Sequence, residues 1–181
     1  MLKKIYLEYK SPINFLLRFF LTFGILSLLY AFWVKSFGTE ADSFSWFVGR
    51  NLEFLAGKQN LSLSQLENQP AIQVWYKGKE SVSLFEGCNG VAVMVLFFAF
   101  LLAFKGTLKH TIVYAVVGIF IIHLFNLGRL MLLVVLSQNN EKWFHFAHKY
   151  LFTLIIYGAV MLLWFVWVKY FSRLNFKSQA T

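Results

Sequence analysis

Cys88 is the only cysteine in this chain of 181 residues, and it lies in Glu86-Gly87-Cys88-Asn89-Gly90, where a polar stretch meets a hydrophobic run. A lone thiol cannot form an internal disulfide, but it can act as a nucleophile. The start of a helix favours the thiolate, because unpaired N–H groups and the helix dipole stabilise negative charge. The backbone N–H groups of Asn89 and Gly90 are candidates for holding an oxyanion. The alternative is a small buried cysteine without a chemical role.

Arg129 lies inside another apolar run, three residues after Asn126. An ionised arginine within a membrane is costly unless it faces a polar cavity or a partner, so a functional role is the first hypothesis. Asn126 would share the same helix face and the same polar task. A guanidinium there could stabilise both a thiolate and the oxyanion of acyl transfer. The alternative is an arginine whose side chain reaches the outer lipid headgroups.

His145 and His148 precede the last apolar run and are one helical turn apart. Either imidazole could carry a proton between a thiol and a leaving amine. The alternative is a pair of interfacial histidines in an aromatic belt with Trp143 and Phe144. The residues alone do not decide between the two histidines.

A metal site is the less favoured interpretation of these side chains. His145, His148 and Cys88 supply three ligands without an obvious fourth. His123 could join only from deeper in the membrane, and His110 is expected at the opposite interface. We therefore expect no metal and no other cofactor.

The composition is that of an integral membrane protein. Hydrophobic residues make up 59% of the chain and charged residues 14%, with 22 phenylalanines, which a water-exposed surface could not accommodate. The 17 basic residues outnumber the 8 acidic ones, but they cluster at the edges of apolar runs. That placement indicates membrane topology, not nucleic-acid binding.

The apolar runs predict one membrane-embedded domain over residues 1–181 that is all-α, with about four transmembrane helices. The second run is short and spans only if the Cys88 turn enters the interface. The first run has a basic front, but its apolar core is too long for a signal peptide, so we expect an uncleaved anchor. The four spans are expected at residues 15–34, 88–104, 111–136 and 150–168.

The basic residues also predict the orientation of the spans. The two ends of the chain and the loop after the second span hold nine basic residues and one acid, whereas residues 35–86 and 137–149 hold seven of each. By the positive-inside rule both termini are cytoplasmic. Cys88, Arg129 and the two late histidines then all lie toward the outer side.

The outer segment, residues 35–87, is the part able to form structure in water. Apolar side chains at helical spacing predict an amphipathic helix at the interface (Phe44, Phe47, Val48, Leu52, Leu55). The alternating residues 72–76, a turn at 77–79 and residues 81–85 predict a small β-hairpin that leads into the cysteine segment.

The Glu-Gly-Cys-Asn-Gly segment, the Asn-x-x-Arg of the next apolar helix and a histidine before the last helix resemble the exosortase/archaeosortase family. The Phe-rich chain, with His148-Lys149-Tyr150-Leu151-Phe152 and Tyr157-Gly158, looks most like the exosortase F type of Bacteroidetes. The resemblance covers most of residues 86–168.

This resemblance implies a cysteine endopeptidase or transpeptidase of the bacterial inner membrane, with its active site on the periplasmic side. The implied catalytic residues are Cys88 as nucleophile, Arg129 as oxyanion stabiliser and His148 as proton carrier, although the nearby His145 leaves the base open. We expect Asn89, Gly90, Asn126 and His145 to bind the substrate (Gly90 through its backbone).

The implied partners are secreted proteins with a C-terminal sorting signal, namely a recognition motif, a transmembrane helix and a basic tail. The lipid bilayer is the other partner, and no nucleic acid is expected. Because four spans are fewer than larger members have, a homodimer or an associated membrane protein could complete the substrate groove. The rival interpretation is a non-enzymatic membrane subunit that assembles an envelope or secretion complex. A small transporter fits poorly, since His123 is the one polar marker in the inner half of the spans.

Overall fold

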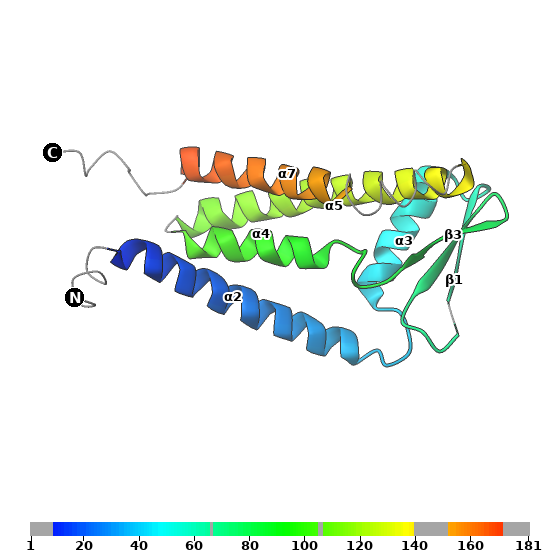
Figure 1. Cartoon of the computed structure of the whole chain (residues 1–181), viewed down its shortest axis with the longest axis horizontal. Coiled ribbons are helices and arrows are strands. Elements are labelled where there is room, and N and C mark those ends of the chain that lie inside the picture. The colour runs from blue at the N-terminus through cyan, green and yellow to red at the C-terminus, as the bar shows by residue number, and fades with distance from the viewer. Residues whose placement is uncertain (1–8, 66, 105–106, 140–151, 172–181) are drawn as a thin grey trace.

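The computed structural model describes residues 9–65, 67–104, 107–139 and 152–171. Long helices run side by side, and a short helix and a small sheet cover one end of them (Figure 1). The predicted His145 and His148 lie outside the described residues. In chain order the helices and strands are α2 (Lys10–Lys35), α3 (Ser43–Ala56), β1 (Leu61–Gln65), β2 (Ile72–Tyr76), β3 (Lys79–Leu84), α4 (Val91–Ala103), α5 (Leu108–Asn139), α7 (Phe152–Val166) and the π-helical turn η2 (Trp167–Phe171).

Within the described part of the chain, two helices are long and apolar enough to cross a bilayer, α2 and the Leu108–Gln138 part of α5. Two shorter apolar helices, Val91–Ala103 and Leu154–Tyr170, accompany them. The helix in the second predicted span begins at Val91, not at residue 88, so Cys88 lies in the loop before it. Its 13 residues cover about 20 Å at 1.5 Å per residue, less than a hydrocarbon core of about 30 Å. The arrangement with four spans therefore stays a prediction.

Helix α5 is longer than the predicted span because it continues through polar residues toward the sheet. Near its end, Gln138 Nε2 donates a hydrogen bond to Ser81 Oγ of β3 at 2.9 Å. The extra turns thereby join the long helices to the part of the chain that carries the sheet.

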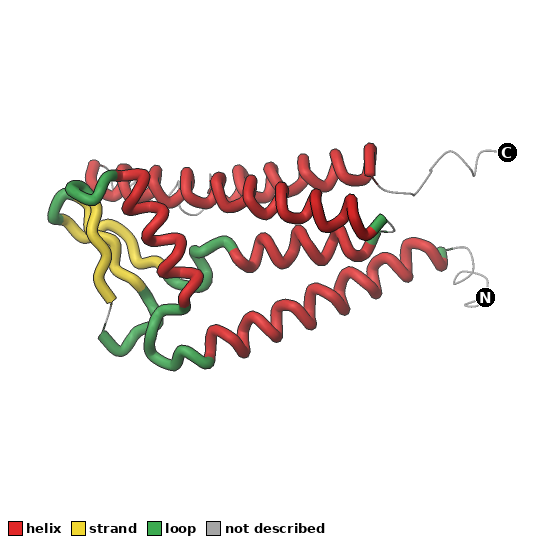
Figure 2. The backbone as a smooth tube through the Cα atoms, turned by 180° about the vertical axis from the view of Figure 1, so that it is seen from behind, coloured by secondary structure: helices red, strands yellow, loops and turns green. Residues whose placement is uncertain are grey.

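The sheet is antiparallel with the strand order β1-β2-β3 and lies at one end of the helices (Figure 2). The predicted hairpin is confirmed as β2 and β3. Tyr76 pairs with Lys79 next to the turn, and Ile72 pairs with Leu84 at the other end of the two strands. Lys77 and Gly78 both have positive φ, at 50° and 76°, as a tight two-residue hairpin turn requires. The sequence analysis missed β1, which pairs with β2 on its other edge.

The predicted amphipathic helix is confirmed as α3. Asp42 begins it as N-cap by accepting hydrogen bonds from the N–H groups of Phe44 and Ser45. Val48 and Leu52 are fully buried against the sheet and α5, whereas Phe47 is 51% exposed.

The two larger hydrophobic clusters of the described residues lie one after the other along the molecule. One joins α3, the sheet and the second half of α5, and Cys88 belongs to it. The other joins α4, the first half of α5, α7 and η2 around Phe97 and Trp167. Helix α2 has no buried residue, and many of its large apolar side chains are exposed, as expected of a helix in lipid, whereas Phe15 and Phe19 pack against Phe100 of α4. The cysteine therefore lies where the lipid-facing helices meet the covered end.

Candidate active site

The loop that carries Cys88 is a tight turn between β3 and α4. The Cys88 N–H donates to the Phe85 carbonyl at 2.8 Å, which closes the turn. Gly90 follows with φ 88° and serves as the N-cap of α4. A Cβ on Gly90 would lie 3.1–3.4 Å from atoms of the Asn126 side chain. Glycine is thus required here both by the backbone angle and by the close approach of α5.

Asn89 fixes this loop to its surroundings. Its Oδ1 accepts the Val91 N–H at 3.0 Å, and its Nδ2 donates to Tyr30 Oη at 2.9 Å and to Ser45 Oγ at 3.1 Å. The side chain is fully buried. Among the described residues, no hydrogen bond uses the backbone N–H of Asn89 or Gly90. The side chain of Asn89 already forms hydrogen bonds within the protein, so the predicted contact of Asn89 with a substrate would have to use its backbone N–H.

The hydrogen bonds continue from Asn89 to the N-terminus of α3. Ser45 Oγ donates to Asp42 Oδ2, while Oδ1 of the same carboxylate caps the helix. Asp42 is 2% exposed and Ser45 fully buried. The loop of Cys88 is therefore tied to α2 through Tyr30 and to α3 through Ser45 and Asp42.

Asn126 of α5 binds the same loop from the other side. Its Nδ2 donates to the Cys88 carbonyl at 3.1 Å, and the residue is fully buried. Its Oδ1 has no hydrogen-bond partner in the described part of the chain, and neither has the buried Nε of Arg129. These two atoms, an acceptor and a donor on residues three apart along one helix, are therefore buried polar groups whose hydrogen-bonding capacity is unused within the described residues.

The Cys88 thiol lies outside the membrane-spanning helices and is 8% exposed. Burial raises the pKa of this thiol above its ordinary value. The positive charge of Arg129 and its hydrogen bond to the thiol oppose the rise, as does a backbone hydrogen bond of Phe85, whereas Glu86 adds to it. The net direction is upward, so the neutral thiol is favoured at neutral pH. Attack by the sulfur would therefore require a base that takes its proton.

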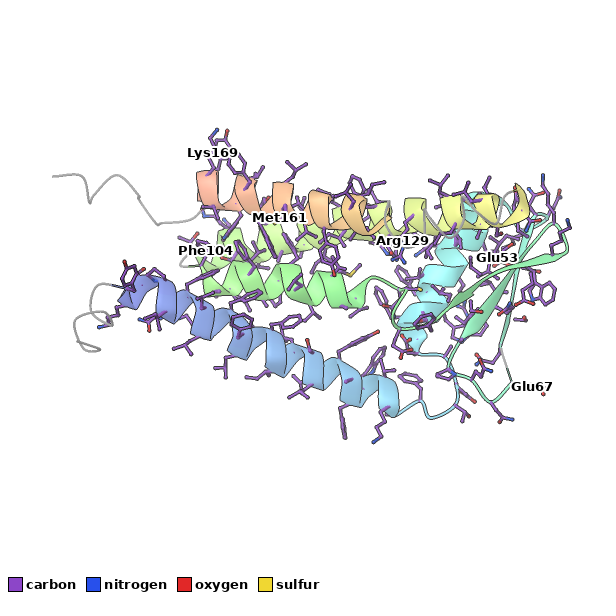
Figure 3. All side chains as sticks on the ribbon, viewed as in Figure 1. Glu53, Glu67, Phe104, Arg129, Met161 and Lys169 are labelled. Atoms are coloured by element: carbon purple, nitrogen blue, oxygen red, sulfur yellow. The ribbon has the colours of Figure 1, made fainter. Side chains whose placement is uncertain are left out.

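Arg129 also forms one wall of a groove between α5 and α7. The groove has a volume of about 310 Å³ and is lined by Leu124, Phe125, Gly128, Arg129, Leu132 and Ile155. Figure 3 shows Arg129 toward the end of the helices that carries α3. The other lining residues are apolar, so the guanidinium is the polar feature of this groove.

His123 lies on α5 one turn before Asn126 and is 9% exposed. Its Nε2 is 3.3 Å from Asn51 Nδ2 of α3, and its ring stacks on Phe47 with centroids 5.4 Å apart. Among the described residues, no three His, Cys, Asp or Glu side chains are close enough together to hold a metal ion. His123 thus joins α3 to α5.

The structure brings together Cys88, Asn89, Gly90, Asn126 and Arg129 of the predicted site. Sequence reasoning missed Tyr30, Asp42 and Ser45, which hold the loop from outside. An aspartate directly before an apolar-periodic helix is a recognisable N-cap signal, so Asp42 could have been found. Tyr30 has no comparable signal in the sequence, because only the fold brings α2 against the loop.

A comparison with protein-family models matches residues 61–166, more than half of the chain, to the transmembrane exosortase family (Exosortase_EpsH). The chain belongs to this family. The match includes the Cys88 loop and all of α4, Asn126 and Arg129. No curated protein and no solved structure matches the chain. The protein is thus a membrane protein of the exosortase type, as the resemblance in the sequence indicated.

Proposed function

We propose that this exosortase-family protein is a membrane cysteine endopeptidase or transpeptidase that cleaves C-terminal sorting signals of secreted envelope proteins. The observation that carries the proposal is the position of Arg129 beside the Cys88 thiol. The two residues come from different parts of the fold, α5 and the loop before α4. A guanidinium next to a lone thiol fits acyl transfer, in which negative charge moves from the sulfur to the substrate carbonyl oxygen.

The proposed reaction begins when His148 or His145 takes the proton of the Cys88 thiol. The sulfur then attacks the carbonyl carbon of the scissile peptide, and Arg129 with the N–H groups of Asn89 and Gly90 stabilises the oxyanion. When the C–N bond breaks, the protonated histidine returns its proton to the leaving amine. The carbonyl stays on sulfur as a thioester until water or an amine displaces it and restores the thiol.

The orientation belongs to the same proposal. Both termini would be cytoplasmic and the active site periplasmic, in the inner membrane of a bacterium, in a chain of the exosortase F type with four spans. The described beginning of α2 and the end of η2 lie at the end of the helices away from the sheet, which supports an even number of crossings (Figure 1). The substrates would be secreted proteins with a motif, a transmembrane helix and a basic tail, and a second copy or another membrane protein could complete their binding.

A non-enzymatic membrane subunit is the second candidate. The burial of Cys88 favours it, because a thiol that is 8% exposed with a raised pKa resembles an inert core cysteine. In that case Arg129 would bind a partner helix, and Cys88→Ala would have no effect on function.

The test is complementation of a deletion strain. Activity is scored by the processing of an epitope-tagged secreted reporter. The reporter carries the C-terminal hydrophobic helix and Arg-rich tail of a protein encoded in the same genome. We expect Cys88→Ala and Arg129→Ala to abolish processing. Arg50→Ala, at an exposed arginine of α3, is the matched control and should process normally. Normal processing by the Cys88→Ala protein, at normal abundance, would exclude the enzyme and favour the subunit.

A further inference from the structure

The groove between α5 and α7 opens to the outside of the helix bundle. Leu124, Phe125, Leu132 and Ile155 are 50%, 45%, 43% and 40% exposed, although all four border the groove. Between them Gly128 contributes no side chain, and a Cβ added there would meet no atom within 4 Å. An apolar depression with a glycine at its floor therefore faces the lipid.

This groove shares Arg129 with the candidate active site. Arg129, the residue after Gly128, lines the groove and also lowers the pKa of the Cys88 thiol. Its buried Nε has no hydrogen-bond partner among the described residues. A chain that lay against Gly128 would thus lie next to the residue whose guanidinium acts on the Cys88 thiol.

We infer that this groove binds the transmembrane helix of the substrate, with Gly128 as the point of closest approach. The inference rests on the proposed function, in which the scissile bond directly precedes a membrane helix. Small residues let the backbones of two membrane helices approach closely, which favours packing in lipid. A helix packed there presents the carbonyl that precedes it to Arg129. The groove thereby positions the scissile bond and selects substrates by their membrane segment.

The first test changes the size of residue 128. Gly128→Ala adds one methyl group at the proposed point of closest approach and should lower processing of the tagged reporter less than a larger side chain does, because the Cβ meets no atom of this chain within 4 Å. Gly128→Leu should fill the groove and lower processing by about tenfold or more, since small displacements of a reacting bond are costly. Gly24→Leu in α2 is the matched control, because a Cβ there also meets no atom within 4 Å. It should change processing by less than about twofold, as expected of a surface position without a partner.

The second test detects binding without reaction. A photo-reactive phenylalanine derivative is placed at Leu124, at Leu132 or, as control, at the 72% exposed Leu28 of α2, each in a Cys88→Ala background. We expect adducts with the uncleaved reporter at Leu124 and Leu132 and none at Leu28. In an otherwise unchanged chain, the rate of Cys88 alkylation by a small neutral reagent should be the same in Gly128→Leu as in the natural protein.

The outcomes separate this inference from the proposed function. Loss of processing in Cys88→Ala, together with normal processing in Gly128→Leu and no reporter adducts in the groove, would overturn the inference alone. Adducts only with lipid or with a second copy of the chain would also overturn it. Slower Cys88 alkylation in Gly128→Leu would mean that the variant acts on the site and not on the substrate, and would count against the inference. Retained processing in Cys88→Ala would instead remove the proposed function itself.

Discussion

At the scale of single residues, two opposing effects determine the reactivity of Cys88. Burial disfavours the thiolate, while the positive charge of Arg129 favours it, and burial is the larger effect. The thiol should therefore be mostly protonated at neutral pH in the resting protein. This arrangement keeps the sulfur unreactive until a base and a substrate are in place.

The balance predicts how alkylation of Cys88 depends on pH. The rate with a small neutral thiol reagent should rise with pH, with a midpoint above that of an exposed cysteine. Removing the charge in Arg129→Gln should raise the pKa of the Cys88 thiol further and move the midpoint upward. Below the midpoint, each unit of that shift slows alkylation about tenfold. Stopped-flow or mass-spectrometric labelling of the purified protein measures the rates.

Arg129→Lys is the control for this pH dependence, since it keeps a positive charge and should shift the midpoint less than Arg129→Gln. The same midpoint in the natural protein and in Arg129→Gln would contradict the described effect of Arg129 on the thiol.

The buried chain of hydrogen bonds from Asp42 to Asn89 makes a second prediction at this scale. Ser45→Ala removes the donor to Asp42 Oδ2 and one acceptor of Asn89 Nδ2. Leaving such groups unpaired costs about 1–3 kcal/mol of unfolding free energy. Thermal unfolding in detergent should show a clear decrease in Tm. Ser62→Ala, at an exposed serine of β1, should change stability by less than about 0.5 kcal/mol, and equal Tm values for the two variants would exclude the network as a stabilising feature.

Residue type and position in the sequence were enough to select three residues as candidates. Cys88 is the lone cysteine at the start of an apolar run, and Asn126 and Arg129 are polar residues within such a run, where polar groups are rare. The side chains that hold the loop could not be selected in the same way. Tyr30 and Ser45 have ordinary neighbours, and their role depends on α2 and α3 meeting the loop. The histidines expected as the base lie outside the described residues, so their role stays a prediction.

At the scale of helices and strands, the sequence predicted those elements whose formation depends on neighbouring residues. The hairpin followed from its Lys77-Gly78 turn, and α3 from apolar spacing. Strand β1 (Leu61–Gln65) is as long as β2 but was missed, because its place in the sheet depends on pairing with β2, which is set by tertiary contacts. The end of α5 was placed too early because the hydrophobic run ends before the helix does.

The start of α4 gives a prediction for Gly90. Gly90→Ala forces a side chain onto φ 88° and brings a Cβ within 3.1 Å of Asn126. The backbone strain alone is about 1–3 kcal/mol. Displacement of Asn126 should also break its hydrogen bond to the Cys88 carbonyl, at a further cost of about 1 kcal/mol. We expect a lower Tm and loss of reporter processing.

Gly78→Ala is the matched control for Gly90→Ala. Gly78 has φ 76°, but a Cβ there meets no atom within 4 Å. It should lose stability from backbone strain alone and keep processing. If Gly90→Ala and Gly78→Ala lost the same stability and both processed the reporter, the close approach of Gly90 to Asn126 would not be needed for activity.

At the scale of the whole molecule, the two ends of the helix bundle differ. The sheet and α3 cover one end, where Cys88 is held, and the described beginnings of α2 and α5 lie at the other (Figure 1). The apolar faces between these ends match a bilayer, since many large hydrophobic side chains of α2 and α5 are exposed. The orientation proposed from the basic residues therefore makes opposite predictions for the two ends.

A membrane-impermeant maleimide tests this orientation in a Cys88→Ala background, so that only an introduced cysteine can react. A cysteine at the exposed Ser62 of β1 (Ser62→Cys) should react in intact spheroplasts. One at the exposed Lys109, near the beginning of α5 (Lys109→Cys), should react only after permeabilisation. Because an impermeant reagent reaches only the outer side, the reverse pattern would place Cys88 on the cytoplasmic side. Secreted substrates could not reach the thiol there, so that result would contradict the proposed sorting reaction even if Cys88 proved reactive.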